Sequence, residues 1–319
     1  MGEVYIGIDL GGTKIKGILM NEDGLIVNQY STSTGNNLDN LFEVIEKLIQ
    51  ENKAMSSRIC GIGVGCAGLI DHKNGITIES ANLPFLKRFP LRYTLYKFTG
   101  IETTIDNDVK MGAIGEMFYG EGKGVKDFVF LTLGTGIGGA IIINGKVYRG
   151  ITNHAGEIGH INLQTAGPDC GCGKKGCYES LASGSAILKY ILYGIKMKRD
   201  TMILEKVKGD ISKINTSLIV EMAENGDRLC LEALTESARY TGKVLSYLIN
   251  ILNPEKIIIG GGLSEVENIL FPVIRETAQL YSLVVPFQNC LIIKAGLGTE
   301  SGVIGAAQIA LLQYKGIEI

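Results

Sequence analysis

The chain of 319 residues lacks an excess of charge of either sign. Its 31 basic and 33 acidic side chains leave a formal net charge of −2. A nucleic-acid-binding protein needs a strongly basic face, so we expect no nucleic-acid partner. Apolar residues make up 45% and charged residues 20% of the chain. This globular balance excludes general disorder, and the length is sufficient for two domains.

Targeting and membrane signals are also missing. The N-terminus, MGEVYIGIDLGG, carries a charge at Glu3 and continues into a strand-like run, so we expect no signal peptide. Gly2 lacks the Ser or Thr four residues on that myristoylation requires. Residues 128–143 carry no charge, but their glycines and β-branched residues predict two strands rather than a membrane span. We therefore expect a cytoplasmic protein without a membrane partner.

An even set of cysteines, as a disulfide framework would have, is absent as well. There are seven cysteines, and those at 60, 66, 230 and 290 lie mostly within apolar runs, as reduced thiols do. The other three form an H-x9-C-x-C-x4-C array with a histidine: His160, Cys170, Cys172 and Cys177. One imidazole and three thiolates form a tetrahedral zinc set, and soft sulfur ligands disfavour magnesium or calcium.

We expect a structural zinc ion at this array, the alternative being three unrelated thiols. Zinc can contribute on the order of 10 kcal/mol to the ordering of a loop that has little core of its own. Glu157 and Glu179 flank the array. The ordered loop would therefore fix the positions of two carboxylates.

Strands and helices alternate along the chain, which predicts the α/β class. Apolar runs predict strands at 5–9, 15–20, 25–30, 58–67, 102–105, 128–133, 140–143, 256–259 and 291–294. Helical periodicity occurs at 38–53, 109–119, 183–194, 216–225, 228–252, 266–283 and 300–313. The order strand, Gly/Thr loop, strand, turn, strand opens the chain and recurs roughly 125 residues later, an internal repeat. No Pro- or Ser-rich linker is present, so a domain boundary is expected near 120–124.

Three glycine-rich turns follow predicted strands: Gly11-Gly12-Thr13, Gly134-Thr135-Gly136 and Gly260-Gly261-Gly262. Such turns leave backbone N–H groups available for phosphate oxygens, although one alone could be only a tight turn. The letters GxGxxG occur from Gly134 and from Gly63, but neither stretch leads into a helix, and no GxxxxGK[ST] is present. A nicotinamide-dinucleotide site and a P-loop are therefore excluded.

Acidic residues follow two of the strands. Asp9 ends the first strand beside a glycine turn, where it could hold Mg²⁺ through water or accept a turn hydrogen bond. Asp106-Asn107-Asp108 lies where a strand leads into a helix. Either aspartate could cap that helix, and only one is needed. The other is then able to accept a proton from a substrate hydroxyl.

Together these motifs resemble the ROK family of bacterial sugar kinases and sugar-responsive repressors. The matching stretches are DLGGTK at 9–14, DND at 106–108, LGTGIGG at 133–139, GEIGH at 156–160, CGCGKKGCYE at 170–179 and GGGL at 260–263. Among the kinases the chain is most similar to the ATP-dependent glucokinases. The resemblance implies an actin-like, ribonuclease-H-like duplicated fold with two lobes around a cleft. The expected lobes are 1–119 plus 300–319, and 120–299 with the zinc loop.

The resemblance also implies roles for individual residues. Asp108 matches the general base. The implied sugar ligands are Gly68, Asn82, Asn107, Glu157, His160 and Glu179. The implied nucleotide-binding residues are Asp9, Gly11, Gly12, Thr13, Lys14, Gly134, Thr135, Gly136, Gly261 and Gly262. One departure is visible: the family's glucokinases often have PNLPGW where residues 81–86 are ANLPFL, so the Asn is kept and a Pro and the Trp are replaced.

The implied activity is transfer of the γ-phosphate of ATP, bound with Mg²⁺, to the 6-hydroxyl of a hexose. Glucose is the expected substrate, with N-acetylmannosamine, N-acetylglucosamine, allose or fructose as alternatives. A repressor of the family would carry roughly 70 or more additional N-terminal residues with a helix-turn-helix, and this sequence begins close to its first strand. We also expect a homodimer or homotetramer.

Overall fold

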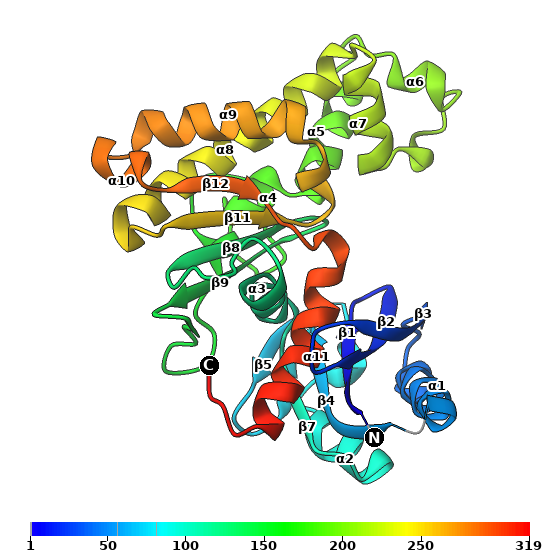
Figure 1. The fold of residues 1–319 in the computed structure, drawn as a ribbon. Helices are drawn as coiled ribbons and strands as arrows, with labels where there is room; N and C mark the ends of the chain where they lie inside the picture. The colour runs from blue at the N-terminus through cyan, green and yellow to red at the C-terminus, as the bar shows by residue number, and fades with distance from the viewer. Residues whose placement is uncertain (1, 56, 81) are drawn as a thin grey trace. The chain divides into compact units, whose positions relative to one another are not determined.

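The computed structural model describes residues 2–55, 57–80 and 82–319 (Figure 1). Ala81, the first residue of the departing stretch at 81–86, lies outside them. The chain forms two compact units. Unit 1 comprises Met1–Phe130, Ala140–Gly156 and Ala295–Ile319, and unit 2 comprises Leu131–Gly139 and Glu157–Lys294. These ranges differ from the expected lobes, whose boundaries stay a prediction.

A five-stranded sheet with the order β3-β2-β1-β4-β7 forms the centre of unit 1. The strands are β1 (Glu3–Leu10), β2 (Lys14–Asn21), β3 (Ile26–Ser33), β4 (Arg58–Cys66) and β7 (Thr103–Asn107). β1, β2 and β3 form an antiparallel meander, whereas β4 runs parallel to β1 and β7 parallel to β4. A small pair, β5 (Leu69–Asp71) and β6 (Ile76–Glu79), follows β4.

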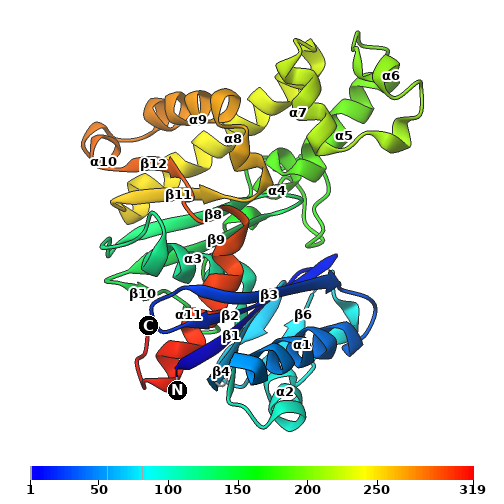
Figure 2. The same ribbon diagram turned by 45° about the vertical axis from the view of Figure 1, so that its right-hand side comes forward.

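Alternation along β1 divides the unit 1 core between the two faces of the sheet. Val4, Ile6 and Ile8 lie in one buried cluster with residues of α1 (Asp39–Met55) and α2 (Leu91–Thr99). Tyr5 lies in a second cluster with residues of α11 (Ser301–Tyr314). Figure 2 shows α1 alongside the sheet from a second side. Asp9 shares the parity of Tyr5, so its side chain points to the α11 face.

Helix α11 is buried along nearly its whole length, because it packs on strands β1 and β4 and on α3 (Asp108–Tyr119). Glycines allow this approach. A Cβ added to Gly63 of β4 would lie 1.7 Å from the Ala306 carbonyl oxygen, and one added to Gly305 would lie 1.7 Å from that of Met111. The end of the chain therefore completes the first unit.

The second five-stranded sheet has the order β10-β9-β8-β11-β12. Its strands are β8 (Phe128–Leu133), β9 (Ile137–Ile143), β10 (Lys146–Val147), β11 (Lys256–Gly260) and β12 (Leu291–Lys294). The order matches that of the first sheet, strand for strand, with the three strands of the repeat on one side and two later strands on the other. The internal repeat predicted from the sequence is thereby confirmed, and so is the α/β class.

The remaining helices belong to unit 2. They are α4 (Tyr178–Ala182), α5 (Gly184–Lys196), α6 (Ile203–Lys206), α7 (Thr216–Glu224), α8 (Arg228–Leu252), α9 (Glu267–Tyr281) and α10 (Val284–Gln288). Asn253, in the left-handed region at φ 47°, ends α8 just before Pro254. The short helices α4, α6 and α10 were not predicted, since five residues or fewer give no periodicity to detect.

Several predicted strand ends differ from the observed ones by one to three residues, and two of these differences lie at or next to predicted site residues. β7 extends through Asp106 and Asn107 rather than ending before them, and β9 begins at Ile137 rather than at Ala140. At β7, pairing of Asp106 and Asn107 with Gly65 and Cys66 of β4 extends the strand past the apolar run. Within the described residues, none of the helices has the length and apolar character needed to traverse a lipid bilayer.

Candidate functional site

The proposed general base lies at the junction of β7 and α3. Asn107, not an aspartate, is the N-cap of α3: its side-chain oxygen accepts hydrogen bonds from the backbone N–H groups of Val109, at 3.0 Å, and Lys110, at 3.2 Å. The expectation that Asp106 or Asp108 caps the helix is therefore wrong. The Asn107 side-chain amide also donates to Asp108 Oδ1 at 2.9 Å. One asparagine thus caps the helix and orients the neighbouring carboxylate.

The same amide reaches a second predicted residue. Asn107 Nδ2 donates to the carbonyl oxygen of Gly68 at 3.1 Å. Gly68 has φ 111°, and a Cβ there would lie 2.3 Å from the Glu79 carbonyl oxygen, so only glycine fits. The structure therefore brings together Gly68, Asn107 and Asp108, three residues that the sequence separates by up to 40 positions.

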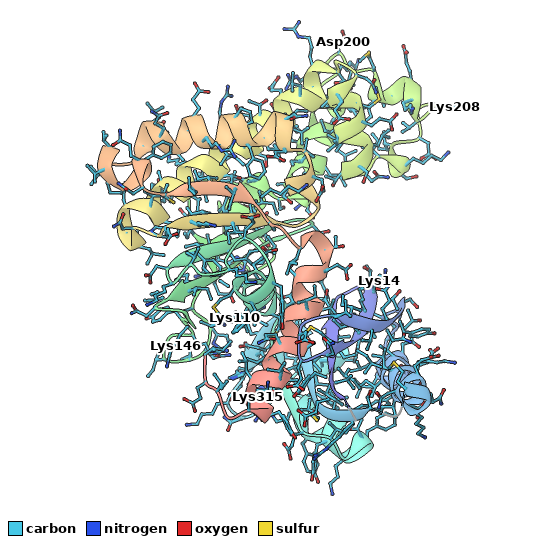
Figure 3. The ribbon with its side chains drawn as sticks, in the orientation of Figure 1. Lys14, Lys110, Lys146, Asp200, Lys208 and Lys315 are labelled. Carbon is cyan, nitrogen blue, oxygen red and sulfur yellow. The ribbon has the colours of Figure 1, made fainter. Side chains whose placement is uncertain are left out.

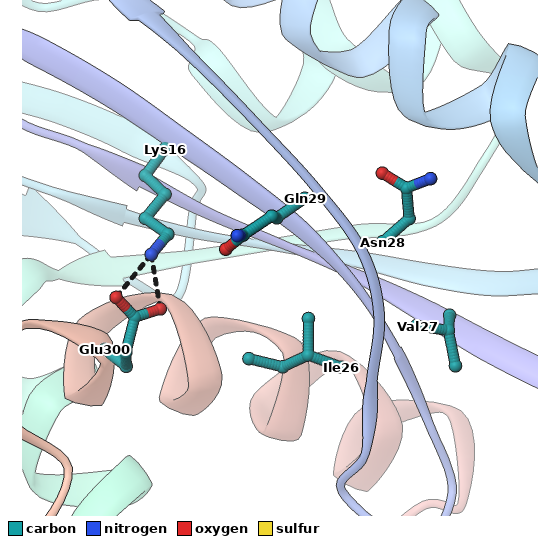
Figure 4. A pocket seen from close by; sticks show the side chains of 6 residues that line it. All are labelled: Lys16, Ile26, Val27, Asn28, Gln29 and Glu300. Carbon is teal, nitrogen blue, oxygen red and sulfur yellow. Dashed lines mark hydrogen bonds and ion pairs between the residues drawn. The ribbon is translucent and has the colours of Figure 1, made fainter.

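Asp9 is the second acidic side chain among the predicted site residues of unit 1. Its burial, and then the negative charge of Asp108, raise the pKa of Asp9 to about 7. Lys16, its pairing partner on β2, acts in the opposite direction. Lys16 forms an ion pair with Glu300 (Figure 4). An acidic side chain whose ionised form is disfavoured in this way suits a bound cation, and its oxygens are the ligands that Mg²⁺ prefers.

Thr34 fixes the first glycine turn through two hydrogen bonds. The Thr34 hydroxyl donates to the carbonyl oxygen of Gly11 at 2.7 Å, and its N–H donates to that of Thr13 at 3.1 Å. Asn82 packs against the turn, since a Cβ on Gly12 would lie 2.6 Å from the Asn82 Cβ. Lys14 begins β2 and is exposed (Figure 3). The predicted phosphate turn and one predicted sugar ligand are therefore neighbours.

A shallow groove also lies on unit 1, at the edge formed by β3. It is lined by Lys16, Ile26, Val27, Asn28, Gln29 and Glu300 (Figure 4). None of the predicted site residues lines this groove. We do not assign it to the candidate site.

The predicted metal ligands converge in unit 2. The ligand atoms of His160, Cys170, Cys172 and Cys177 all lie within 4.8 Å of one another. Cys172 Sγ lies 3.7 Å from Cys177 Sγ, and Cys170 Sγ lies 3.7 Å from His160 Nδ1. A tetrahedral ion with Zn–S bonds of about 2.3 Å places its sulfur ligands about 3.8 Å apart. The donor set and its spacing therefore fit zinc.

Glu179 joins this cluster to the second glycine turn. Its Oε2 accepts the backbone N–H of Ile137 at 3.0 Å, and a Cβ on Gly136 would lie 2.6 Å from the same oxygen. Its Oε1 lies 3.8 Å from Cys170 Sγ. Tyr178, the preceding residue, is fully buried and donates its hydroxyl to Thr241 of α8 at 2.8 Å. Helix α8 thus anchors the segment that carries Glu179.

The N-terminus of α5 holds the second glycine turn. Gly184 N–H donates to the Gly134 carbonyl oxygen at 2.8 Å, and the Ser185 hydroxyl donates to that of Thr135 at 2.8 Å. Gly261, at φ 84°, approaches the end of β8, where a Cβ would lie 2.5 Å from the Leu133 carbonyl oxygen. Gly262 follows at the start of a single 3₁₀ turn. Two of the three predicted glycine turns are therefore neighbours in this unit.

The predicted site residues thus fall into two sets. Unit 1 contains Asp9, Gly11, Gly12, Thr13, Lys14, Gly68, Asn82, Asn107 and Asp108. Unit 2 contains Gly134, Thr135, Gly136, Glu157, His160, Cys170, Cys172, Cys177, Glu179, Gly261 and Gly262. Glu157 and His160 are both exposed, as substrate ligands must be.

Sequence reasoning missed the residues that hold these sets in place. Thr34 and Arg149 stand in no motif, and Tyr178 lies within the matching stretch 170–179 but received no role from it. Their hydrogen-bond partners are distant in sequence or are backbone groups, so these residues cannot be identified from the spacing of residue types along the chain. The one available signal was Asp106, an aspartate directly after the predicted strand 102–105, because a carboxylate that is buried there requires a partner.

Comparisons with known proteins agree with this geometry. A profile described as "ROK family" matches residues 5–313. The glucokinase of Halalkalibacterium halodurans is 32% identical, covering 98% of this chain and 97% of its own. The xylose repressor of Caldicellulosiruptor bescii is also 32% identical, covering 96% of this chain and 77% of its own. The solved ROK family glucokinase of Streptomyces griseus, in complex with glucose and AMPPNP, is 30% identical with a TM-score of 0.84, covering 97% of this chain and 99% of that one. The chain, with its actin-like fold, belongs to the ROK family.

Proposed function

We propose that the protein is an ATP-dependent kinase that phosphorylates the 6-hydroxyl of a hexose, with glucose as its substrate. Relatives named glucokinase, alike over nearly their whole length, support a sugar kinase. The solved relative from Streptomyces griseus holds glucose and AMPPNP, an ATP analogue, which supports the choice of glucose and ATP.

The observation that carries the proposal is the arrangement of Asp108 and Asn107 at the end of β7. The Asn107 amide, at 2.9 Å, and the Val109 N–H, at 3.0 Å, both donate to Asp108 Oδ1. A carboxylate oriented in this way can act as a general base. In the proposed step Asp108 takes the proton of the 6-hydroxyl, the hydroxyl oxygen bonds to the γ-phosphorus, and the bond to the bridging oxygen breaks to release ADP.

Phosphoryl transfer depends more on positioning and charge neutralisation than on covalent chemistry. The proposal gives the phosphates to the turns at 11–13 and 134–136, with Gly261 and Gly262 nearer the nucleoside. Asp9 would hold Mg²⁺ through water, and the bound Mg²⁺ would neutralise phosphate charge. The raised pKa of Asp9, caused first by burial, favours this role because a cation compensates the ionised carboxylate.

The proposal assigns hydroxyl-binding roles to Gly68, Asn82, Asn107, Glu157, His160 and Glu179. His160 would bind zinc through Nδ1, the nitrogen that faces Cys170 Sγ, and leave Nε2 for a hydroxyl. Zinc would be held by His160 and the three cysteines and would stabilise the loop without taking part in the chemistry.

A coupled kinase assay over a panel of hexoses tests the proposal, with ATP and polyphosphate compared as donors. We expect glucose with ATP to give the highest kcat/KM among glucose, fructose, allose, N-acetylglucosamine and N-acetylmannosamine. A clear preference for another sugar would leave the chemistry standing and correct the substrate. Absence of phosphorylation with every sugar and both donors would overturn the kinase.

The role of Asp108 has its own test. Asp108→Ala should lower kcat by at least about 10²-fold while glucose and ATP bind nearly as before, because a general base acts mainly in the transition state. Glu157→Gln should instead raise the glucose KM, since Glu157 would hold a hydroxyl in ground and transition states alike. Calorimetric titration of glucose, beside steady-state kinetics, separates the two effects. An Asp108→Ala enzyme with normal kcat would remove the assignment.

A repressor is the second candidate, favoured by the similarity to the xylose repressor of Caldicellulosiruptor bescii. The two candidate functions differ in two measurable properties, DNA binding and kinase activity. A repressor of this sequence would bind operator-like DNA and would lack kinase activity, whereas the kinase needs no DNA.

A further inference from the structure

Asp106 lies beside the proposed base but has a different surrounding. Its side chain is fully buried and forms an ion pair with Arg149. Oδ1 accepts the backbone N–H of Asn107 at 2.8 Å. Oδ2 lies 3.1 Å from both Nε and a terminal nitrogen of Arg149, a side-on pairing with the guanidinium. The charge of Asp106 is therefore balanced by a residue 43 positions away.

The segment that follows Arg149 is attached at two further points, to β5 and to α3. The Asn153 amide donates to the carbonyl oxygen of Ile70, in β5, at 2.8 Å. The ammonium of Lys110, a buried residue of α3 labelled in Figure 3, donates to the Asn153 carbonyl oxygen. Asn153 itself is held at φ 67°, a left-handed conformation that needs such support.

His72 completes the cluster. Its Nδ1 lies 2.8 Å from the carbonyl oxygen of Ile105 and 3.5 Å from Asp106 Oδ2. Burial lowers the pKa of His72, although the charge of Asp106 opposes the shift. The imidazole therefore donates to the backbone of β7 as a neutral side chain. The contacts of Asp106 and His72 fix β7 just before Asn107 and Asp108, while Arg149 also donates from Nη1 to the carbonyl oxygen of Ile319 at 2.6 Å.

We infer that Asp106 and Arg149 are positioning residues for the phosphoryl transfer, acting through Asn107 and Asp108. The inference rests on the proposed function. Any buried aspartate needs a matching charge and hydrogen bonds to its oxygens. What distinguishes Asp106 is the donor it takes, the peptide N–H of Asn107, because Asn107 is the residue that orients the Asp108 carboxylate. A displacement of the base by a fraction of an ångström to about 1 Å is enough to cost up to about 10²-fold in rate.

Neutralising Asp106 tests the inference. In Asp106→Asn the side chain keeps its shape, but its amide cannot accept hydrogen bonds from both Arg149 and the Asn107 N–H. We expect kcat per folded molecule to fall about 10- to 100-fold, while the glucose Kd, measured by calorimetry, stays within about threefold. Arg149→Lys keeps the positive charge but loses the planar array of N–H donors of the guanidinium. It should retain more activity than Arg149→Met.

The matched control is Asp227→Asn in unit 2. Asp227 is also buried, and it caps α8 and accepts hydrogen bonds from Thr201 and from the N–H groups of Met202 and Cys230. This variant should melt earlier than wild type and keep its kcat. In a double variant, Asp106→Asn with Arg149→Met, kcat should fall no further than in the worse single variant, because the two residues act as one unit.

Each outcome decides between the readings. If Asp106→Asn melts earlier but keeps its kcat, as the control does, the pair serves stability alone and the inference is wrong. Should Asp106→Asn fail to fold, equal kcat values for wild type, Arg149→Lys and Arg149→Met overturn it in the same way. A wild-type protein without kinase activity overturns the proposed function and this inference with it, whereas an active wild type with unaffected variants overturns the inference alone.

Discussion

At the scale of single residues, the carboxylates of unit 1 differ in how their charge is balanced. Asp106 is fully buried and matched by a guanidinium, whereas Asp9 is half-buried and experiences the negative charge of Asp108. The pKa of Asp9 is accordingly raised to about 7, first by burial and then by Asp108. The ionised form of this carboxylate near the end of the first strand is therefore disfavoured, which agrees with its proposed role in holding Mg²⁺.

This predicts that Asp9→Asn stabilises the ligand-free protein at alkaline pH. The folded pKa of about 7 exceeds the ordinary value of 3.8, so the contribution of protonated Asp9 is fully present below about pH 4. It is lost as the pH rises through 7. We expect the melting temperature of Asp9→Asn to exceed that of wild type by a few degrees at pH 8 and to match it at pH 4.

Thermal melts at both pH values, without Mg²⁺ or nucleotide, measure this difference. Asp200→Asn, which neutralises an exposed aspartate, is the control and should leave both melting temperatures unchanged (Figure 3). The same melting temperature for Asp9→Asn and wild type at pH 8 would show that Asp9 carries no unfavourable charge.

At the scale of elements, glycines of unit 1 determine how closely α11 packs on the sheet and on α3. Gly63 of β4 and Gly305 of α11 stand where backbone meets backbone. Helix propensity taken alone argues the other way, since Ala is about 1 kcal/mol more favourable than Gly inside a helix. The contact, not the propensity, therefore sets the residue type at position 305.

Gly305→Ala should destabilise the protein by about 1–3 kcal/mol or more, because its Cβ would meet the Met111 carbonyl oxygen at 1.7 Å, and backbone cannot move aside cheaply. Chemical denaturation measures the change. Gly2→Ala is the control, since a Cβ there has only the Ser57 hydroxyl at 3.9 Å as a neighbour. A stabilised Gly305→Ala protein would mean that propensity outweighs the packing of α11 on α3.

At the scale of the whole molecule, neither unit is a continuous stretch of chain. The chain passes from one unit to the other after residues 130, 139, 156 and 294. Each unit therefore needs distant segments before its sheet or helix pairing is complete. The metal-ligand cluster is the exception, since its four ligands lie within 18 residues, between His160 and Cys177. Its ordering should respond to metal without the rest of the chain.

We accordingly expect about one zinc per chain by metal analysis, and local loosening when it is lost. Cys172→Ser removes an exposed ligand with little lost packing and should speed hydrogen exchange within 157–182, but not in β4 of unit 1. Lys174→Ser, an exposed change in the same loop, is the control and should leave exchange unchanged. A wild-type protein free of zinc, with Cys172→Ser as stable and active, would contradict the metal site.

The sequence alone was sufficient for features that depend on neighbours along the chain. Helix α8 and strand β12 have the predicted bounds, the topological repeat was visible in the order of strands and glycine turns, and the four metal ligands converge as their spacing required. Periodicity, turn chemistry and ligand spacing are local, so they can be read before any tertiary contact is known.

Only the tertiary structure decided which side chain does what at the end of β7. The sequence left the cap to either aspartate, but pairing with β4 extends β7 through Asn107, so α3 begins at Asp108 and Asn107 is its cap. Asp106 instead pairs in the core with Arg149, 43 residues along the chain. The approach of α11 to β4 likewise depends on a backbone contact between Gly63 and Ala306. A buried charge takes the partner that the fold brings to it, and no local pattern of residues names that partner in advance.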